Sequence, residues 1–469
     1  MKNTLILALR NLQRNRRRSV TTALAIIVGV CAILLFGGFS KDIMLGMQTD
    51  FVRHGGHLQI QRHGYFVYGA GNPRAYGIAN YERVMDVLRE DPALREMIVV
   101  VTPTLELGGV AGNFAAGASR TVYAEGSIAA EQSRMQAWNE YGFNDPLEVA
   151  PLENTSADAA VIGEGLARML RLCGPLRVSD CAEPRDVATE SAPEEGASAP
   201  GDVLALAAAE QSGAGAGASS GPRIDLLAAS AHGVPNVGSF TVAKAQRQGV
   251  KELDDIYVAL HLPAAQRLVY GAEAPRVTAI EVQLKHTAQL PEARRRIEAL
   301  LASRFSGEPM QVLDFATLNP SYGQTIGMFD VIFEFVFVLI AAIVLFVVSN
   351  TMSTSVVERT VEIGTLRAMG DRRGDIQTLF VYEGLLLGLL GTVAGVLVAL
   401  LVSFGVNRSG LMWTPPARVD PIALTVRVWG QWRQIGLTFV ILAIVATVSS
   451  WWPARRASRL SIVDALRHV

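Results

Sequence analysis

The chain has 469 residues, of which half are hydrophobic, and its formal net charge at pH 7 is −1. Its length alone suggests about three soluble domains, but the apolar residues are concentrated in a few long runs, which excludes an ordinary soluble protein. A near-neutral chain also lacks the basic excess of nucleic-acid-binding proteins, and we expect no nucleic-acid partner.

Residues 1–19 are predicted to form a cytoplasmic amphipathic elbow helix. Its apolar and basic side chains fall on opposite helical faces, made of Leu5, Ile6, Leu9 and Leu12 on one and Arg10, Arg14 and Arg17 on the other. A helix with two such faces lies flat in the membrane interface. A frayed chain terminus is the alternative.

Four apolar runs are each long enough to cross a bilayer core of roughly 30 Å, which takes about 20 helical residues. The predicted transmembrane helices are residues 20–40, 329–351, 381–406 and 435–452. The first follows a basic stretch, but its apolar core is longer than the roughly 7–15 residues of a secretory signal. We therefore expect an integral membrane α-helical protein with an uncleaved first span.

Lysine and arginine near the spans predict the orientation, because they concentrate on the cytoplasmic side. Residues 1–18 hold six basic residues and no acidic one, and the tail at 453–469 holds four arginines against one aspartate. Both termini and the loop at 352–380 are therefore expected in the cytoplasm. Residues 41–328 and 407–434 are expected in the periplasm, which places the protein in a bacterial inner membrane.

The segment 41–328 is predicted to be a large α+β domain built from two β-α-β units. Alternating apolar residues predict strands at 57–61 and 97–110 around a helix near 81–96, and the same order recurs at 277–284, 291–305 and 310–315. An inserted, mainly β subdomain is expected at about 121–275. Its predicted strands are residues 202–208, 238–245 and 255–262.

Residues 180–235 are predicted to contain flexible loops. The part from 180 to 222 is rich in Ala, Gly, Ser, Pro and Glu, which bury too little apolar surface to offset chain entropy. A mobile hairpin that meets a partner and an inert linker are both open interpretations. Nearby, Cys173 and Cys181 are eight residues apart in a segment that we expect in the oxidising periplasm. A disulfide between them and two free thiols are both open.

The motifs of several enzyme classes are absent from the sequence. There is no phosphate-binding loop of the G-x-x-x-x-G-K-[ST] type, no H-E-x-x-H and no G-x-S-x-G. His54, His57 and His63 lie close together, but without a neighbouring carboxylate we expect neither a metal site nor catalysis. Glu334 and Glu383 are charged residues at the ends of predicted spans, where we expect them to be hydrated.

The third predicted span carries a stripe of small residues. Gly384, Gly388, Gly391 and Gly395 recur at spacings of four, three and four. Small residues on one helical face let two helix backbones approach closely. The stripe predicts a packing seam against another span or a second subunit, with ordinary glycine enrichment of membrane helices as the alternative.

The loop at 352–380 is predicted to contain a short charged helix between two spans. Arg359 and Glu362 are spaced for an i,i+3 pair, and Gly370 permits the turn that follows. Because neither connection to the spans is long, a force on this helix must move both of them. A surface helix that only joins two spans is the alternative.

Two stretches, "ERTVEIGTLRAMGDRRGDI" (358–376) and "EGLLLGLLGTVAG" (383–395), carry a resemblance to a known family. They resemble the FtsX-like permease domain, which is shared by MacB-type exporters, the lipoprotein-releasing permeases LolC and LolE, and FtsX. The segments 8–30 and 453–469 resemble the two ends of that family, and the segment 240–268 resembles its periplasmic core domain.

The resemblance implies that the charged helix is a coupling helix that docks on a separate cytoplasmic P-loop ATPase subunit. The implied docking residues are Glu358, Arg359, Glu362, Gly364, Arg367 and Gly370. It also implies a permease without catalysis, which binds no cofactor itself, while ATP and Mg²⁺ are bound by two copies of the partner. A second permease chain, identical or paralogous, completes the assembly.

The expected activity is movement or release of lipoprotein or other lipophilic cargo in the periplasm, driven by the partner's ATP hydrolysis. A periplasmic carrier or adaptor is a further expected partner. Two alternatives stay open, an FtsX-like regulator of a periplasmic cell-wall hydrolase and a MacB-like drug or peptide exporter. The fused ATPase of MacB has no counterpart in this sequence, which favours the lipoprotein-releasing type.

Overall fold

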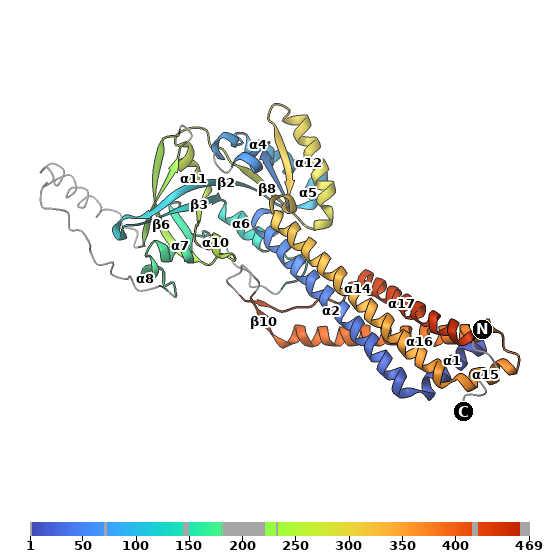
Figure 1. Ribbon diagram of the computed structural model, residues 1–469. Coiled ribbons are helices and arrows are strands. Elements are labelled where there is room, and N and C mark those ends of the chain that lie inside the picture. Colours follow the sequence, from blue (N-terminus) through green and yellow to red (C-terminus); the bar gives the residue numbers. More distant parts are fainter. Residues whose placement is uncertain are drawn as a thin grey trace, which may run out of the picture. The chain divides into compact units, whose positions relative to one another are not determined.

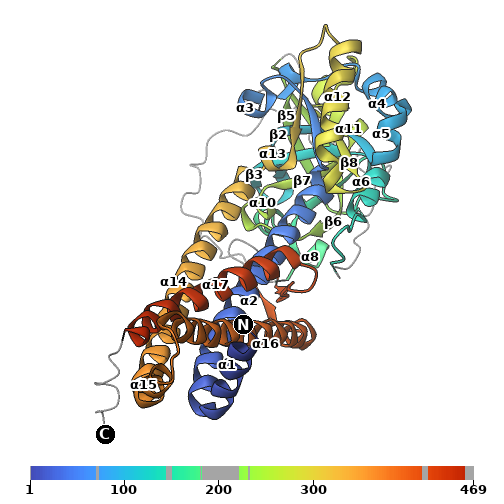
Figure 2. The ribbon, with the colours of Figure 1, turned by 90° about the vertical axis from the view of Figure 1, so that its right-hand side faces the viewer.

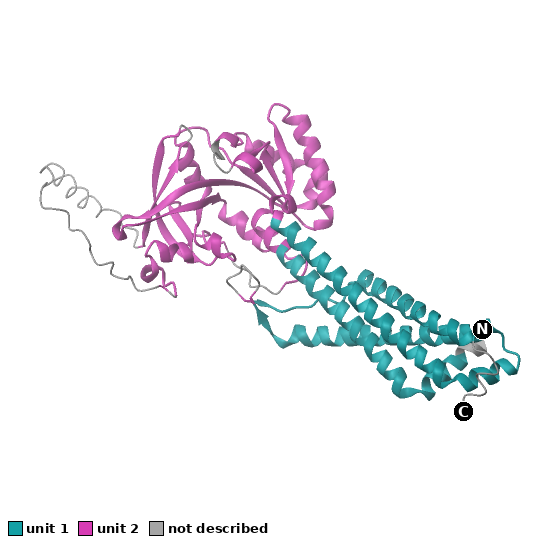
Figure 3. Cartoon of the chain, in the orientation of Figure 1, with its two compact units in different colours: residues 1–47, 321–413, 422–469 teal, residues 48–320, 414–421 magenta. Residues whose placement is uncertain are grey.

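The computed structural model describes residues 2–69, 73–143, 150–179, 181, 221–230, 233–414 and 421–459. The chain divides into two compact units, shown in Figure 3. Unit 1 consists of Met1–Met47, Ser321–Trp413 and Ile422–Val469, and unit 2 consists of Gln48–Pro320 and Thr414–Pro421.

Unit 1 is a bundle of helices. They are α1 (Lys2–Arg14), α2 (Arg16–Gly55), α14 (Pro320–Glu358), α15 (Thr360–Ala368), α16 (Arg373–Ser409) and α17 (Trp432–Ser458), with a two-strand ribbon of β10 (Met412–Trp413) and β11 (Ile422–Ala423). Helices α2, α14, α16 and α17 are long and apolar enough to cross a membrane. The four predicted transmembrane helices are therefore confirmed as helices of the required length and composition.

The core of unit 1 is aliphatic and is supplied by all four long helices. Its buried side chains include Ile26, Val30, Ile33 and Leu34 from α2, Val344 and Val348 from α14, Leu387 and Ala399 from α16, and Leu442 and Ala446 from α17. Val426 and Val428, from the segment before α17, join the same cluster. Large apolar side chains on the outside of the bundle, such as Phe335 and Leu401, are exposed, as expected for helices that face lipid.

Unit 2 contains the two predicted β-α-β units, which interlock in one sheet region. The first runs from β1 (Leu58–Arg62) through α4 (Tyr81–Glu90) and α5 (Pro92–Met97) to β2 (Ile98–Asn113). The second runs from β8 (Ala279–Leu284) through α12 (Leu290–Arg304) to β9 (Met310–Asp314). The strand order β2-β8-β1-β9 places one strand of each unit between the two strands of the other, and every neighbouring pair is antiparallel.

Helices α4, α5 and α12 lie together on one side of these four strands (Figure 1 and Figure 2). Their buried side chains recur at helical spacing, for example Ala293, Ile297 and Leu300 on α12. Leu58 and Ile60 of β1 are wholly buried in the same cluster. The alternating strand pattern read from the sequence therefore corresponds to a sheet with one face against helices.

The inserted subdomain is a ring of six strands. It is formed by the second half of β2 with β3 (Ala118–Ser127), β4 (Ala159–Gly163), β5 (Arg223–Ala229), β6 (Pro235–Gln246) and β7 (Tyr257–His261). The pairings β2–β3, β3–β7, β7–β4, β4–β6, β6–β5 and β5–β2 close on themselves. The other α-helices among the described residues of unit 2 are α3 (Tyr65–Tyr68), α6 (Ala129–Gln136), α7 (Glu164–Met169), α8 (Cys173–Leu176), α10 (Lys251–Asp254), α11 (Leu262–Tyr270) and α13 (Phe315–Leu318).

The structure differs from the sequence prediction within residues 180–235. Arg223–Ala229 form β5 instead of a flexible loop, because Ile224, Leu226 and Ala228 alternate with outward-facing residues and fill the ring interior. The strand expected at 202–208 lies outside the described residues. Cys173 and Cys181 are joined by a disulfide, with Cα atoms 6.3 Å apart.

Candidate functional site: the hairpin between α14 and α16

The hairpin that joins α14 to α16 contains the helix α15. The helical path breaks at Arg359, where φ is −108° and ψ is 17°, and resumes at Thr360. After α15, Gly370 has a φ of +110°, a conformation that favours glycine, and this residue turns the chain toward α16. The side chain of Asp375 accepts a hydrogen bond of 3.1 Å from the backbone N–H of Arg372 at the start of α16. Both ends of α15 therefore connect to long helices through very few residues.

The inner face of α15 is anchored in a small apolar cluster. Ile363 is buried against Val356 of α14, Ile376 and Phe380 of α16, and Ala454 and Ala457 of α17. Phe380 is among the largest fully buried side chains of the described chain. This cluster makes α15 part of the bundle and not a free surface helix.

The outer face of the hairpin is apolar and bordered by acids. Val357, Val361 and Met369 are 72%, 45% and 72% exposed. The side chains of Glu358 and Glu362 beside them are about half exposed, at 51% and 48%. We call these five residues the docking face. An exposed helix with apolar anchors and flanking charges has the chemistry of a helix that inserts into a partner's groove.

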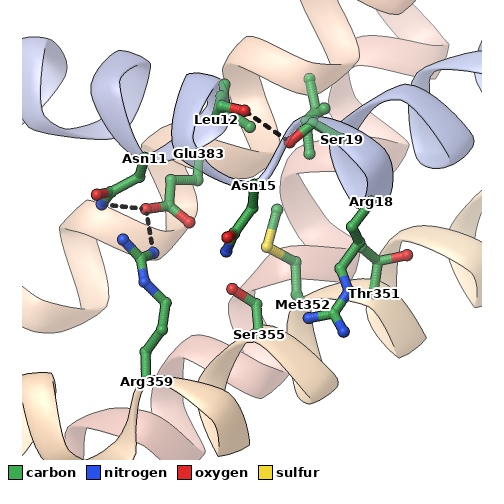
Figure 4. A pocket seen from close by; sticks show the side chains of 11 residues that line it. Asn11, Leu12, Asn15, Arg18, Ser19, Thr351, Met352, Ser355, Arg359 and Glu383 are labelled. Carbon is green, nitrogen blue, oxygen red and sulfur yellow. Dashed lines mark hydrogen bonds and ion pairs between the residues drawn. The ribbon is translucent and has the colours of Figure 1, made fainter.

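A buried ion pair fastens the start of α15 to α16. The guanidinium Nη1 of Arg359 donates to Oε1 of Glu383 over 2.9 Å, and the side chains are only 8% and 4% exposed. Asn11 of α1 donates from Nδ2 to the same carboxylate oxygen over 2.6 Å, as Figure 4 shows. Arg359 also donates from Nε to Glu362 over 3.2 Å. The expectation that Glu383 is hydrated is wrong, because α1 and the Arg359 side chain cover it.

The N-terminal helices contribute two further ion pairs to the hairpin. Arg18 of α2 donates to Glu358, with 2.6 Å between Nη1 and Oε2, and Arg14 of α1 pairs with Glu362. Figures 1 and 2 show α1 and α15 at the same end of unit 1. The pocket of Figure 4 lies beside these contacts and is lined by polar groups that include Asn15, Ser355 and Thr351.

The predicted docking residues divide into two groups. Glu358, Glu362 and Gly370 are exposed and Arg367 is half-buried, so these four are accessible to a partner. Arg359 and Gly364 are buried and can act only by shaping the hairpin. Sequence reasoning missed the roles of Asn11, Arg14 and Arg18, because their partners are more than 300 residues away in the chain.

The glycine stripe of α16 is a seam between helices of this chain. A Cβ added at Gly388 would lie 2.7 Å from the Cβ of Ala446 on α17, and one at Gly395 would lie 2.6 Å from the Cβ of Val30 on α2. A Cβ added at Gly384 would lie 2.5 Å from the Cβ of Ser450 on α17, and one at Gly391 would lie 2.9 Å from the Cβ of Ile26 on α2. The seam therefore joins α16 to two other helices of the same bundle.

Among the three neighbouring histidines, His57 has a structural role. This side chain is fully buried, and its Nδ1 accepts a hydrogen bond of 3.1 Å from the backbone N–H of Leu284. Burial lowers the pKa of His57 to about 4, so the ring is neutral at physiological pH. Within the described ranges, no group of three or more His, Cys, Asp or Glu side chains is arranged to hold a metal ion.

Comparison with known proteins identifies the region that carries this hairpin. Residues 334–462 match the family described as FtsX-like permease C-terminal. The chain contains an FtsX-like permease domain. This domain includes most of α14 and all of α15, α16 and α17, whereas α1 and α2 precede it.

A separate comparison with curated proteins finds relatives that are named as permeases of ABC transporters. An uncharacterized ABC transporter permease of Methanocaldococcus jannaschii is 28% identical over 49% of this chain and 55% of its own length. The macrolide export ATP-binding/permease protein MacB of Sodalis glossinidius is 34% identical over 37% of this chain and 25% of its own. The lipoprotein-releasing system transmembrane protein LolC of Neisseria meningitidis is 25% identical over 50% of this chain and 57% of its own.

These matches cover about half of the length of the relatives or less. Among solved structures, the periplasmic region of MacB from Actinobacillus actinomycetemcomitans matches 58% of this chain and 94% of its own, with 11% identity and a TM-score of 0.33.

Proposed function

We propose that this protein is the permease subunit of an ABC transporter and that α15 docks on a separate ATP-hydrolysing subunit in the cytoplasm. The FtsX-like permease domain and the permease relatives support the transporter class. The sequence itself contains no phosphate-binding loop. ATP and Mg²⁺ would accordingly be bound by two copies of the partner, and a second permease chain would complete the transporter.

The observation that carries this proposal is the two-sided character of α15. Its inner face is buried with Ile363, whereas its outer face exposes Val361 and Met369 beside two carboxylates. Val361 and Met369 stay exposed in the described chain, and a position at the cytoplasmic side would keep them out of lipid. Exposed apolar side chains of this kind mark an interaction surface.

The anchoring of α15 supports transmission of movement to the spans. A partner that displaces α15 must also displace α14, to which it is joined at Arg359, and α16, to which Arg359 is bound through Glu383. Because packed interiors resist deformation, the displacement would pass along these helices and not be absorbed locally. We propose that it drives movement of a lipoprotein or another lipophilic cargo on the periplasmic side of a bacterial inner membrane.

The docking proposal is tested by binding of a purified P-loop ATPase subunit from the same organism to the full chain in lipid nanodiscs. Val361→Asp and Met369→Asp place a charge in the proposed apolar contact. Interface anchors of this type are worth about 2 kcal/mol or more, so each variant should weaken binding by about 30-fold. Glu362→Gln should weaken binding less and lower the ATP hydrolysis that is coupled to transport.

Val237→Asp is the matched control, because Val237 is also an exposed valine, at 58%, but belongs to β6 in unit 2. This variant should bind like the unaltered chain. If the ATPase binds Val361→Asp and Met369→Asp with unchanged affinity, α15 is not the docking element. If it does not bind the unaltered chain, the proposed pairing with an ATPase is wrong.

A further inference from the structure

The two carboxylates of the docking face are already engaged within the chain. Glu358 receives two hydrogen bonds from Arg18, at 2.6 Å from Nη1 and 2.5 Å from Nη2. Glu362 is paired with Arg14 and also accepts a hydrogen bond of 3.2 Å from Nε of Arg359. Both arginines precede the first long apolar run, so the N-terminal helices hold the acidic border of the docking face.

These two contacts differ from the buried ion pair behind them. In the Arg14–Glu362 pair both side chains are about half exposed, at 57% and 48%, and in the Arg18–Glu358 pair they are 29% and 51% exposed. Exposed ion pairs contribute little to stability because water and salt screen them. The pair of Arg359 and Glu383 is almost fully buried and anchors α15 without them. The arginines can therefore leave the docking face while α15 stays in place.

A partner that uses the docking face must compete with these arginines. An apolar groove that accepts Val361 and Met369 brings its rim close to Glu358 and Glu362, and burying a carboxylate without a cationic or hydrogen-bonding partner is costly. At Glu358 the rim must then either supply its own cation or include Arg18, whereas Glu362 keeps its hydrogen bond to Arg359 and needs less compensation. Exchange of one cation for another is nearly balanced in free energy, which makes it suitable for a reversible contact.

We propose that Arg14 and Arg18 are intramolecular competitors that occupy Glu358 and Glu362 until an ATPase subunit with a basic groove rim displaces them. This inference rests on the proposed function of α15. The N-terminal helices would thereby lower the affinity of the docking face for its partner and limit docking to partners with complementary charge. Both arginines lie outside the region that matches the FtsX-like permease domain, residues 334–462.

The experiment compares Arg14→Gln, Arg18→Gln and the double variant with the unaltered chain, each as full-length protein in nanodiscs, by titration with the purified ATPase subunit. An exposed ion pair is worth up to about 1 kcal/mol, so each single variant should bind up to about five-fold more tightly. The double variant should show the product of the two effects. The gain should shrink at high salt concentration.

Arg17→Gln is the matched control. Arg17 lies between the other two arginines and is exposed, and it makes no ion pair with a residue that the structure describes. The Arg17→Gln variant removes one positive charge from the same segment and should leave the affinity for the ATPase subunit unchanged. The unfolding midpoint of each variant shows that the bundle has remained intact.

The direction in which the affinity for the ATPase subunit changes decides whether the arginines compete with it. Weaker binding of Arg14→Gln or Arg18→Gln would make these arginines part of the docking surface and would overturn the competition. An unchanged affinity would overturn it as well, and so would an equal gain in Arg17→Gln, which would reflect net charge alone. Failure of the unaltered chain to bind would instead remove the proposed function, and this inference with it.

Discussion

At the scale of single residues, the hairpin between α14 and α16 depends on one buried carboxylate. Glu383 accepts hydrogen bonds from Arg359 and Asn11, so three separate parts of the chain meet at one side chain. A buried ion pair is a poor source of net stability, since removal from water costs about as much as the attraction returns. Its value lies in geometry, because only one arrangement of the three segments satisfies all of its hydrogen bonds.

Breaking this pair should therefore cost more than replacing it. Arg359→Met leaves Glu383 buried without its cation and should lower the free energy of unfolding of unit 1 by about 3–5 kcal/mol. The double variant Arg359→Met/Glu383→Leu should be less destabilised than Arg359→Met alone. Denaturant titration in detergent of the unaltered chain, Arg359→Met, Glu383→Leu and the double variant measures these free energies of unfolding. A double variant that is the least stable of the four proteins would contradict this account.

A second residue-scale feature is a group of carboxylates on the strands of unit 2. Glu106 of β2 lies directly opposite Glu125 of β3, and Glu281 of β8 is only 3% exposed. Burial raises the pKa of Glu125 to about 7, with a further contribution from the charge of Glu106. Burial also raises the pKa of Glu281, and the charge of Glu125 adds to the effect.

The stability of unit 2 should accordingly fall as the pH rises. The folded state holds more protons than the unfolded state between the ordinary carboxyl pKa and about 7, so protonation contributes fully below that window and is lost through it. The loss should be on the order of 3 kcal/mol, from about 1.4 kcal/mol for each pH unit. Protection of the β2 and β3 amides from hydrogen exchange, followed as a function of pH, measures this loss of stability. Glu125→Gln should make the stability depend less on pH. An unchanged pH dependence in this variant would show that Glu125 is not the titrating group.

At the scale of helices and strands, the sequence predicts the elements that depend on local patterns. Run length identified the four long helices, and alternation identified β1, β2, β8 and β9. Closure of the ring was not predictable, because the parallel pairs β3–β7 and β4–β6 join segments far apart in sequence. The ion pairs of the hairpin were missed for the same reason. Opposite charges that meet only after folding leave no periodic signal in either segment.

The glycine seam gives a prediction at this scale. Gly388→Ile inserts a branched side chain where even a Cβ would meet Ala446 at 2.7 Å, so α16 and α17 must separate. Such overpacking typically costs about 1–3 kcal/mol. Gly405→Ile, on the same helix, is the control, because nothing lies within 4 Å of its Cβ position. Thermal unfolding should show a lower midpoint for the first variant only, and equal midpoints would argue against a packing role.

At the scale of the whole molecule, the proposed function requires the docking face and unit 2 to be on opposite sides of the membrane. Val357→Cys and Val237→Cys, each introduced after replacement of Cys31 by serine, place thiols at sites that are 72% and 58% exposed. An impermeant thiol reagent should label the second in intact spheroplasts and the first only after permeabilisation. Labelling of Val357→Cys from outside would reverse the orientation and remove the cytoplasmic docking site.

Strand β2 belongs to both parts of unit 2. Its first half pairs with β8 in the four-stranded sheet, and its second half pairs with β3 and β5 in the closed ring. The two parts thus share one continuous strand, whose pairing passes from β8 at Thr104 to β3 at Leu105. Because no loop separates the two halves of β2, a pull on the sheet passes directly to the ring. Under tension, the sheet and the ring of unit 2 should therefore move together as one rigid body. When the force is high enough, they should unfold in a single step.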